Sequence, residues 1–189
     1  WHIAYFKKYS NRKEMTAIMI FVSGVHGVGK SHFCDMVRKK ININTYSAST
    51  LIANKKQSDF AKDKHISDID KNQQLLIKAV EELNATNHKF IIDGHFCLLD
   101  ANGKITRVPY STFSSLNPEA ILLLTEKPEI IAIRRKKRDG VIVSPKSIEQ
   151  FQKAECAYAV EVSNSIQSKL FISNGSEDLT QALDFIKLL

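Results

Sequence analysis

The sequence predicts an α/β protein in which helices cover both faces of a five-stranded parallel sheet. Short runs rich in apolar and β-branched residues alternate along the chain with segments whose apolar residues recur at helical spacing. This alternation indicates parallel strands, because each of them needs a crossover connection to reach the next. The chain has 189 residues, 43% hydrophobic and 25% charged, as expected for one soluble globular domain. We therefore expect a single compact domain of three layers.

The most specific motif lies between the first predicted strand and the first predicted helix. Residues 17–23 form an apolar run with the length of a buried strand, and residues 32–40 carry apolar side chains at helical spacing. The segment between them, Gly24-Val25-His26-Gly27-Val28-Gly29-Lys30-Ser31, has two glycines five positions apart followed by Lys and Ser. A strand, such a loop and a helix in succession are the context that a phosphate-binding loop requires. The motif predicts the three-layer P-loop NTPase fold.

The chemistry of this loop follows from its backbone. Glycines let successive N–H groups converge on phosphates, and the N-terminus of the following helix adds a positive dipole end. Lys30 can reach the β- and γ-phosphates of a nucleoside triphosphate, and the Ser31 hydroxyl can ligate Mg²⁺. We expect residues 24–31 and the adjoining His32 to bind the nucleotide. His26 is expected to shape the loop or to face the sheet, not to act as a catalyst.

The middle of the chain continues the alternation. Residues 45–49 predict a short strand and residues 50–56 a helix, whereas the polar, lysine-rich residues 57–70 predict a loop. Residues 72–84 place apolar side chains on one helical face, which indicates an amphipathic helix. Residues 89–93 are an apolar run that ends in a carboxylate, and they predict a third buried strand.

The last third of the chain supplies two more strands. Residues 120–125 predict the fourth strand, and Pro128 suits the first position of a helix that runs to residue 138. Residues 147–150 have the pattern of a capping box that opens a long helix. The predicted stripe of this helix consists of Phe151, Glu155, Tyr158 and Val162. Residues 169–173 predict the fifth strand, and Ser176 is expected to cap the final helix.

A second informative segment is Ile91-Ile92-Asp93-Gly94-His95. A carboxylate at the C-terminal end of a parallel strand beside the loop is where this architecture accepts a Mg²⁺-bound water. Asp93 can hold that water while Ser31 ligates the metal, and the alternative is an aspartate that only forms a turn. His95 fits two interpretations equally, a contact with a substrate phosphate or base and a structural hydrogen bond.

A basic segment follows the fourth predicted strand. Arg134 and Arg138 are four residues apart, so they share one helix face and can converge on phosphates. The guanidinium fork matches phosphate oxygens, and its charge does not titrate away. Gly140 then opens a short lid. The alternative interpretation is a solvated helix end whose charge complements the helix dipole.

Charge and cysteines give weaker indications. The formal net charge is +7, and residues 1–14 contribute +3 of it, from four Lys or Arg against one Glu. We expect these residues to be an N-terminal extension or an expression remnant, with the P-loop domain at 15–189. Small phosphate-bearing substrates explain the remaining charge as well as nucleic acid does, so a nucleic-acid partner stays open as an alternative that we do not favour. The scattered cysteines, Cys34, Cys97 and Cys156, are expected to be reduced thiols of a cytoplasmic protein. No apolar run has the length of a membrane span.

Over residues 17 to 189 the chain resembles the archaeal-type adenylate kinases, within the nucleoside monophosphate kinases. The resemblance rests on the loop 24–31 and on a set of shorter motifs: Asp93-Gly94-His95, where the family has Asp-Thr-His, Gly103 with Pro109, Leu116-Asn117-Pro118-Glu119, Arg134-Arg135 with Arg138-Asp139, and Ile172-Ser173-Asn174. It implies the strand order 2-3-1-4-5, ATP in the loop, Arg134 and Arg138 in a lid, and Asn174-Gly175 beside the adenine. Phosphate would pass from ATP-Mg²⁺ to a nucleoside monophosphate, usually AMP.

The acceptor side departs from the pattern of such kinases, which normally clamp the monophosphate with arginines. No arginine lies between Arg38 and Arg107, and the segment 55–71 offers only lysines. Lysine is a workable point charge for phosphate but a poor bidentate clamp. Arg107 stands where the family tends to have glycine, and we expect it to bind the acceptor with His95. Two alternatives stay open: a kinase of a polynucleotide 5′ end or a small alcohol, and an ATP-dependent switch or weak ATPase that acts on a macromolecular partner.

Overall fold

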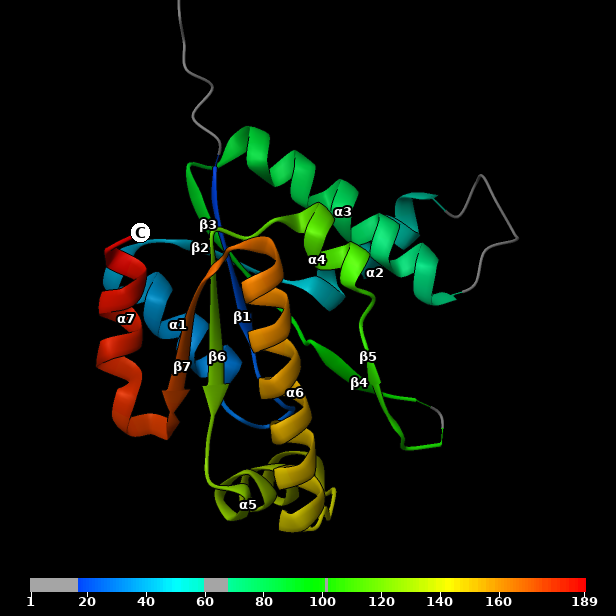
Figure 1. Ribbon diagram of the computed structural model, residues 1–189, viewed down its shortest axis with the longest axis vertical. Coiled ribbons are helices and arrows are strands. Elements are labelled where there is room, and N and C mark those ends of the chain that lie inside the picture. Colours follow the sequence, from blue (N-terminus) through cyan, green and yellow to red (C-terminus); the bar gives the residue numbers. More distant parts are fainter. Residues whose placement is uncertain (1–16, 60–67, 101) are drawn as a thin grey trace, which may run out of the picture.

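The structure is a computed structural model that describes residues 17–59, 68–100 and 102–189. Its centre is a parallel sheet of five strands with helices on both faces, which confirms the predicted fold class (Figure 1). The strands are β1 (Ile18–Ser23), β2 (Asn44–Ser47), β3 (Lys89–Asp93), β6 (Ala120–Thr125) and β7 (Lys169–Asn174). They lie in the order β2-β3-β1-β6-β7, which is 2-3-1-4-5 when the five parallel strands are numbered by themselves.

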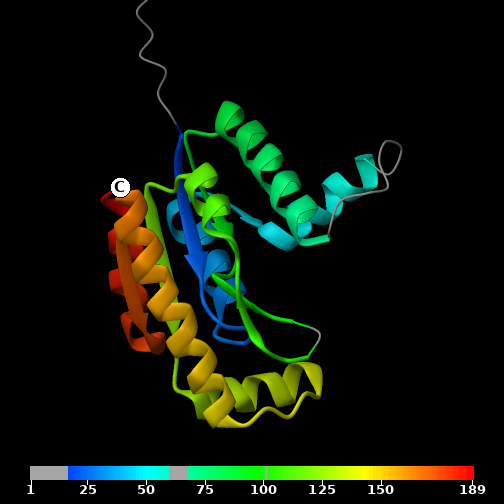
Figure 2. The ribbon, with the colours of Figure 1, turned by 45° about the vertical axis from the view of Figure 1, so that its right-hand side comes forward.

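Seven α-helices and one 3₁₀ helix surround the sheet in the described ranges. They are α1 (Lys30–Ile41), α2 (Ala48–Asp59), α3 (Asp68–Thr86), α4 (Tyr110–Leu116), α5 (Pro128–Asp139), α6 (Pro145–Ile166), α7 (Leu179–Lys187) and the 3₁₀ turn Gly175–Asp178. One face of the sheet is covered by α1 and α7, and the other by α3, α4 and α6 (Figure 2). Within these ranges, no helix has the length and apolarity that a membrane span requires.

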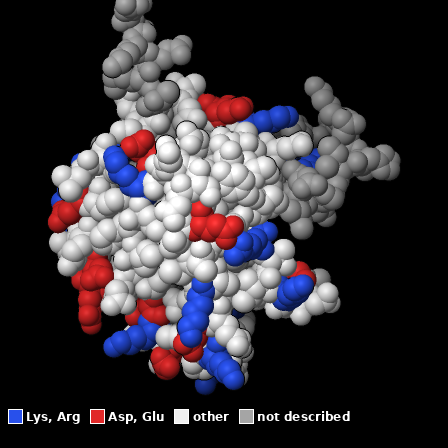
Figure 3. Space-filling model, viewed as in Figure 1, with Lys and Arg blue, Asp and Glu red and all other residues white. Residues whose placement is uncertain are grey.

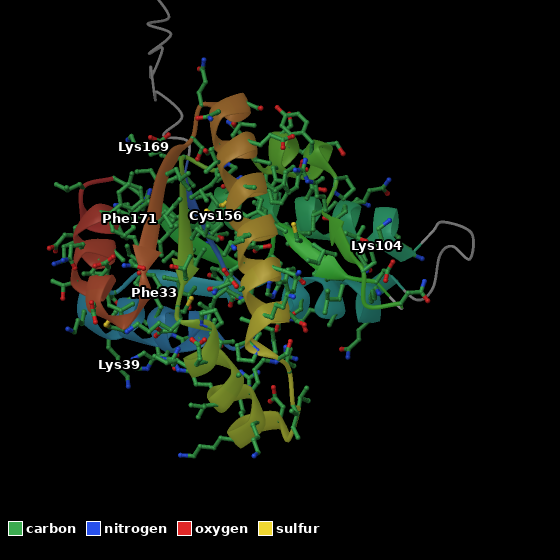
Figure 4. All side chains as sticks on the ribbon, turned by 60° about the horizontal axis from the view of Figure 1, so that its bottom comes forward. Phe33, Lys39, Lys104, Cys156, Lys169 and Phe171 are labelled. Atoms are coloured by element: carbon green, nitrogen blue, oxygen red, sulfur yellow. The ribbon has the colours of Figure 1, made fainter. Side chains whose placement is uncertain are left out.

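The two faces are built by the alternation of side chains along each strand. Met19 and Phe21 of β1 face the α3, α4 and α6 side, whereas Ile20 and Val22 face the α1 and α7 side. All four side chains are buried, as a parallel sheet between two helical layers requires. Phe33 of α1, fully buried, points toward the sheet (Figure 4). The register pairs Val22 with Asp93, so β1 and β3 end at the same edge of the sheet.

Four aromatic side chains form a cluster on the α6 side, below the edge where β1 and β3 end. The ring centroids of Phe96 and Phe113 are 4.5 Å apart, and Phe21 meets both rings edge-on at 5.3 and 5.5 Å. Tyr158 of α6 meets Phe96 and Phe113 edge-on at 6.1 Å. Such pairs contribute about 0.5–1.5 kcal/mol each beyond their buried area. The cluster therefore forms a rigid packed layer against this end of the sheet.

Several predicted element boundaries are wrong. Helix α6 begins at Pro145, because Ser144 caps it by accepting the N–H of Ser147 at 3.1 Å, and the capping box predicted at 147–150 lies inside the helix. The last helix begins at Leu179, after a 3₁₀ turn that contains Ser176. Helices α2 and α3 extend into the predicted loop 57–70, of which 60–67 lie outside the described residues. The predicted extension 1–14 lies outside them too.

A short antiparallel hairpin was not predicted at all. Strands β4 (Cys97–Leu99) and β5 (Ile105–Arg107) pair beside the main sheet, where the chain passes from β3 to α4 (Figure 1). Each strand has only three residues, too few for an alternating pattern to stand out. The hairpin carries Leu98 toward the end of β3, and this position matters for the site described next.

Candidate active site

The phosphate-binding loop connects β1 to α1, in the strand, loop and helix context that the sequence predicts. Gly24 has φ 145°, and a Cβ there would lie 2.5 Å from the carbonyl oxygen of Leu124. Gly27 has φ 89°, and a Cβ there would lie 2.7 Å from Cγ of Arg135. Both positions therefore exclude a side chain, by backbone conformation and by space. The N-terminus of α1 begins at Lys30, so its free N–H groups face the same loop.

Lys30 bridges two segments at the edge of the sheet. Its Nζ donates to the carbonyl oxygen of Gly24 at 2.7 Å and lies 3.3 Å from Nε2 of His95. Burial lowers the pKa of Lys30 to about 8, although the negative charges of Asp93 and Glu155 act to raise it. The ammonium is thus confined near the loop but still charged at neutral pH. It can exchange its carbonyl contact for a phosphate oxygen.

His95 is held neutral beside Lys30. Burial, followed by the positive charge of the neighbouring Lys30, lowers the pKa of His95 to about 3. We assign the ring proton to Nδ1, because the ammonium of Lys30 can only donate and Nε2 must accept. In the described residues Nδ1 has no hydrogen-bond partner although it is buried. His95 is therefore a poor base with a free donor.

Asp93 and Ser31 are the oxygen ligands available to a metal ion. Asp93 ends β3, half-buried, and burial raises the pKa of its carboxyl while the charge of Lys30 lowers it. Ser31 is exposed in the first turn of α1. Among the described residues no group of three or more His, Cys, Asp or Glu side chains forms a metal site. A hydroxyl and a carboxylate fit Mg²⁺, which keeps several waters and binds together with substrate phosphates.

A cavity lies beside the loop, between β6, α1, α5 and the start of α7. Its volume is about 280 Å³, and its walls come from β6, the loop, α1, α5 and the start of α7: Val28, Gly29, His32, Leu124, Thr125, Glu126, Arg134, Gly175 and Leu179. The structure therefore brings His32, Arg134 and Gly175 together. Asn174 lines a neighbouring cavity of about 130 Å³ that shares Glu126 and Gly175.

The two predicted lid arginines both contact the loop. Arg134 donates to the carbonyl oxygen of Val28 at 2.9 Å and to Glu126 at 3.1 Å. One turn later, Arg138 contacts Nε2 of His26 and donates to Asp139 at 2.6 Å. The shared helix face is confirmed. His26, however, is exposed and faces the end of α5, so the expectation that it faces the sheet is wrong.

The surface near these arginines is of mixed charge. Helix α5 has three basic residues in its last turn, and Figure 3 shows Lys and Arg at the lower end with Asp and Glu among them. The hydrogen bond from Arg138 lowers the pKa of Asp139 to about 2. The face of this end that Figure 3 shows therefore carries charges of both signs.

A second pocket lies beside the phosphate-binding loop, and Asp93, Gly94 and His95 at the end of β3 form one of its walls. Its volume is about 220 Å³, and its other walls come from β1, β2, α2, α3, β4 and α4: Phe21, Ser47, Ala48, Ser49, Ile52, Gln73, Leu76, Leu98, Val108, Thr112, Phe113 and Leu116. None of the described residues that line it is Lys or Arg. A Cβ at Gly94 would lie 2.7 Å from the Phe21 ring, so any larger residue at this position would require that ring to shift.

One polar group in this pocket has no partner. Thr112 of α4 is 2% exposed, and its Oγ1 makes no hydrogen bond in the described residues. A helical threonine usually donates to the carbonyl four residues earlier. Here that carbonyl, of Val108, already accepts the Tyr158 hydroxyl at 2.8 Å. With Nδ1 of His95, the pocket thus has two buried polar atoms that a ligand can satisfy.

Arg107 does not reach this pocket, so the expectation that it replaces the missing clamp is wrong. It lies on β5 opposite Cys97, its guanidinium bonds Glu161 at 2.8 Å, and it covers the Tyr158 ring at 4.4 Å. Side chains alternate along a strand, and this position faces α6 instead of the pocket.

Glu155 is a residue whose importance the sequence reasoning missed. It lies on α6, 1% exposed, and its carboxylate accepts from Ser23 at the end of β1 and from the N–H groups of Phe96 and Cys97 at the start of β4. The available signal was a carboxylate within an otherwise apolar stripe, since a buried charge is costly unless it is hydrogen-bonded.

The loop, the two cavities that flank it and the two arginines of α5 define an ATP-dependent P-loop phosphotransferase. A family model described as an AAA domain matches residues 23–152. The chain belongs to this family and is an adenylate kinase-like P-loop kinase.

Two archaeal relatives and one solved structure are similar to it. The adenylate kinase of Pyrobaculum aerophilum is 29% identical over 82% of this chain and 83% of its own length. The adenylate kinase of Pyrococcus furiosus is 24% identical over 90% of this chain and 94% of its own. The shikimate kinase of Bacteroides thetaiotaomicron shares the fold, with a TM-score of 0.51 and 12% identity over 90% of this chain and 96% of its own.

Proposed function

We propose that the protein is a nucleoside monophosphate kinase of the adenylate type. The observation that carries this proposal is the contact between Lys30 and His95, at 3.3 Å, because it joins the phosphate-binding loop to the second pocket. A donor phosphate on the loop and an acceptor in the pocket would meet at this contact. The archaeal adenylate kinases that the chain resembles over most of its length support the same activity.

The residues divide into donor and transfer groups. The loop 24–31 with Lys30 holds the phosphates of ATP, Ser31 and Asp93 hold Mg²⁺, and the cavity beside Arg134 and Gly175 holds the base. Magnesium neutralises phosphate charge when bound, and Arg134 and Arg138 stabilise the charge of the transferring group. Phosphoryl transfer needs little covalent work, so catalysis is positioning and electrostatics. The cofactors are then ATP and Mg²⁺, the partner is a small nucleotide, and the compartment is the cytoplasm.

The state of His95 favours a monophosphate acceptor over an alcohol. A monophosphate oxygen is already anionic and needs no base, whereas a hydroxyl loses its proton during transfer. His95, with a pKa of about 3, is unsuited to remove that proton, and its Nδ1–H is suited to donate to a phosphate oxygen. The apolar walls of the pocket suit a nucleobase.

A kinase of a small alcohol is the second candidate, because no Lys or Arg is among the described residues that line the pocket. A phosphorylated acceptor would normally meet such a cation. Asp93 would then be the base. The similarity of fold to a shikimate kinase is compatible with this candidate.

The test is a panel of acceptors incubated with γ-³²P-ATP and Mg²⁺: AMP, CMP, GMP, UMP, a 5′-hydroxyl oligonucleotide, shikimate and gluconate. We expect label in a nucleoside diphosphate, ADP above all, and none with Lys30→Ala. Label in shikimate or gluconate would establish the second candidate, and label in the oligonucleotide would indicate a polynucleotide kinase. Release of inorganic phosphate alone, whatever the acceptor, would indicate an ATPase or switch.

A further inference from the structure

We propose that Glu155 is a positioning residue that keeps the turn after β3 aligned with the phosphate-binding loop during transfer. The proposal rests on the phosphotransferase activity, not on the identity of the acceptor. Glu155 lies in the middle of α6, the long helix that follows the lid helix α5 in the chain and packs along the sheet (Figure 2). It is not among the residues that line the pocket beside His95 or the cavity beside Arg134, so it acts through its neighbours.

One carboxylate joins the two segments that make the site. Its Oε1 accepts from the hydroxyl of Ser23 and from the N–H of Phe96 at 2.9 Å, and its Oε2 accepts from the N–H of Cys97 at 2.7 Å. Ser23 immediately precedes the loop, and Phe96 immediately follows His95. Glu155 therefore connects the entry of the donor loop to the exit of the acceptor turn from inside the core.

Lys30 connects the same two segments from the outside. It contacts the carbonyl oxygen of Gly24, next to Ser23, and Nε2 of His95, next to Phe96. When its ammonium turns to a nucleotide phosphate, this outer bridge is lost. The last backbone hydrogen bond between β1 and β3 runs from the N–H of Gly94 to the carbonyl oxygen of Val22 at 2.9 Å. Past this bond, the inner bridge through Glu155 then holds the two segments together.

The chemistry of the position supports this role. Burial raises the pKa of Glu155, so its charge is costly here unless hydrogen bonds offset the cost. Three donors converge on the carboxylate, and a charged acceptor makes shorter and stronger hydrogen bonds than a neutral one. The carboxylate thus secures a geometry that an apolar residue cannot.

The test compares Glu155→Gln with Val162→Ala, a truncation seven residues along the same helix in the same buried cluster. Transfer of label from γ-³²P-ATP is measured with the acceptor that wild type prefers, or with water if it uses none. In Glu155→Gln an amide N–H₂ replaces one accepting oxygen, so we expect kcat to fall at least about tenfold, or 1.36 kcal/mol in the barrier. The Kd for ATP should stay within about threefold. Val162→Ala should lower the melting temperature but leave kcat unchanged well below it.

A kcat for Glu155→Gln within about twofold of wild type would overturn the proposal, as would an equal fall in Val162→Ala. If Glu155→Gln does not fold, Ser23→Ala decides. It removes one donor and leaves both backbone N–H groups bonded to the carboxylate, and we expect kcat to fall about threefold with the fold intact. An unchanged kcat in folded Ser23→Ala would then reject the role.

Discussion

Arg134 of α5 donates to the carbonyl oxygen of Val28 at 2.9 Å, so this helix is hydrogen-bonded to the phosphate-binding loop itself. One turn further, Arg138 contacts His26 of the same loop. The two arginines therefore both contact the phosphate-binding loop. Their charges are in place for a phosphoryl group held by the loop, and this arrangement leads to the first prediction.

Arg138→Ala is expected to slow transfer by at least about 10²-fold and to change ATP affinity far less, because its charge acts on the transferring group. Arg138→Lys should restore only part of the rate, since lysine keeps the charge but loses the fork. Lys137→Ala, an exposed neighbour in the same helical turn, is the matched control and should behave as wild type. A kcat for Arg138→Ala within about twofold of wild type would assign Arg138 to a solvated helix end.

Binding of ATP is expected to depend on Lys30 and on Mg²⁺. Lys30→Ala removes the cation that reaches the phosphates, so calorimetry should show clear ATP binding in wild type with Mg²⁺ and little binding in the variant. Chelation of Mg²⁺ should weaken binding to wild type as well, since Ser31 and Asp93 then lose their partner. Equal affinity in wild type and Lys30→Ala would show that the glycine loop is not the nucleotide site.

The affinity for ATP is also expected to fall as the pH rises through about 8, the value to which burial lowers the pKa of Lys30. The affinity falls because only the ammonium form of Lys30 attracts phosphate. A bound phosphate raises the pKa of Lys30 again, so ATP binding above pH 8 takes up a proton. Calorimetry in buffers of different ionisation enthalpy measures that uptake. Lys30→Arg keeps its charge and should lack the uptake, and a wild-type affinity that is flat from pH 7 to 9.5 would contradict the assignment.

Arg107→Ala is expected to leave the KM of the acceptor unchanged and to lower stability. The substitution removes an exposed ion pair with Glu161 and a cation–π contact with Tyr158, which together amount to about 1–2 kcal/mol. Urea denaturation measures the free energy of unfolding. Lys104→Ala, an exposed position just before β5, is the control. A raised acceptor KM in Arg107→Ala would show that Arg107 binds the acceptor after all.

The sequence was informative where one local pattern dominates. Strands 89–93 and 120–125 were predicted with their observed ends, because uninterrupted apolar runs between polar residues are easily recognised. The phosphate-binding loop was recognisable because its function depends on glycines at fixed spacing, and Gly24 has no room for a side chain. Helix starts were less certain where several serines compete, as at Ser144 and Ser147.

The acceptor side was harder to predict, because it depends on contacts between distant segments. The direction of Arg107 is set by its place in a three-residue strand, and its sequence neighbours do not reveal which face it takes. The second pocket is assembled from six elements besides the turn after β3, so no short motif marks it. Glu155 bonds to residues 132 and 59 positions away in the chain, and only the folded structure brings them together.

The central claim, that the pocket beside His95 holds the phosphoryl acceptor, is tested most directly by blocking that pocket. Ile52 lines it from α2, whereas the next residue, Ala53, is exposed and does not. Ile52→Trp is expected to raise the KM for AMP at least about tenfold and to leave the KM for ATP within about twofold, while Ala53→Trp changes neither. An unchanged KM for AMP in Ile52→Trp, or an equal rise in both KM values, would contradict this account.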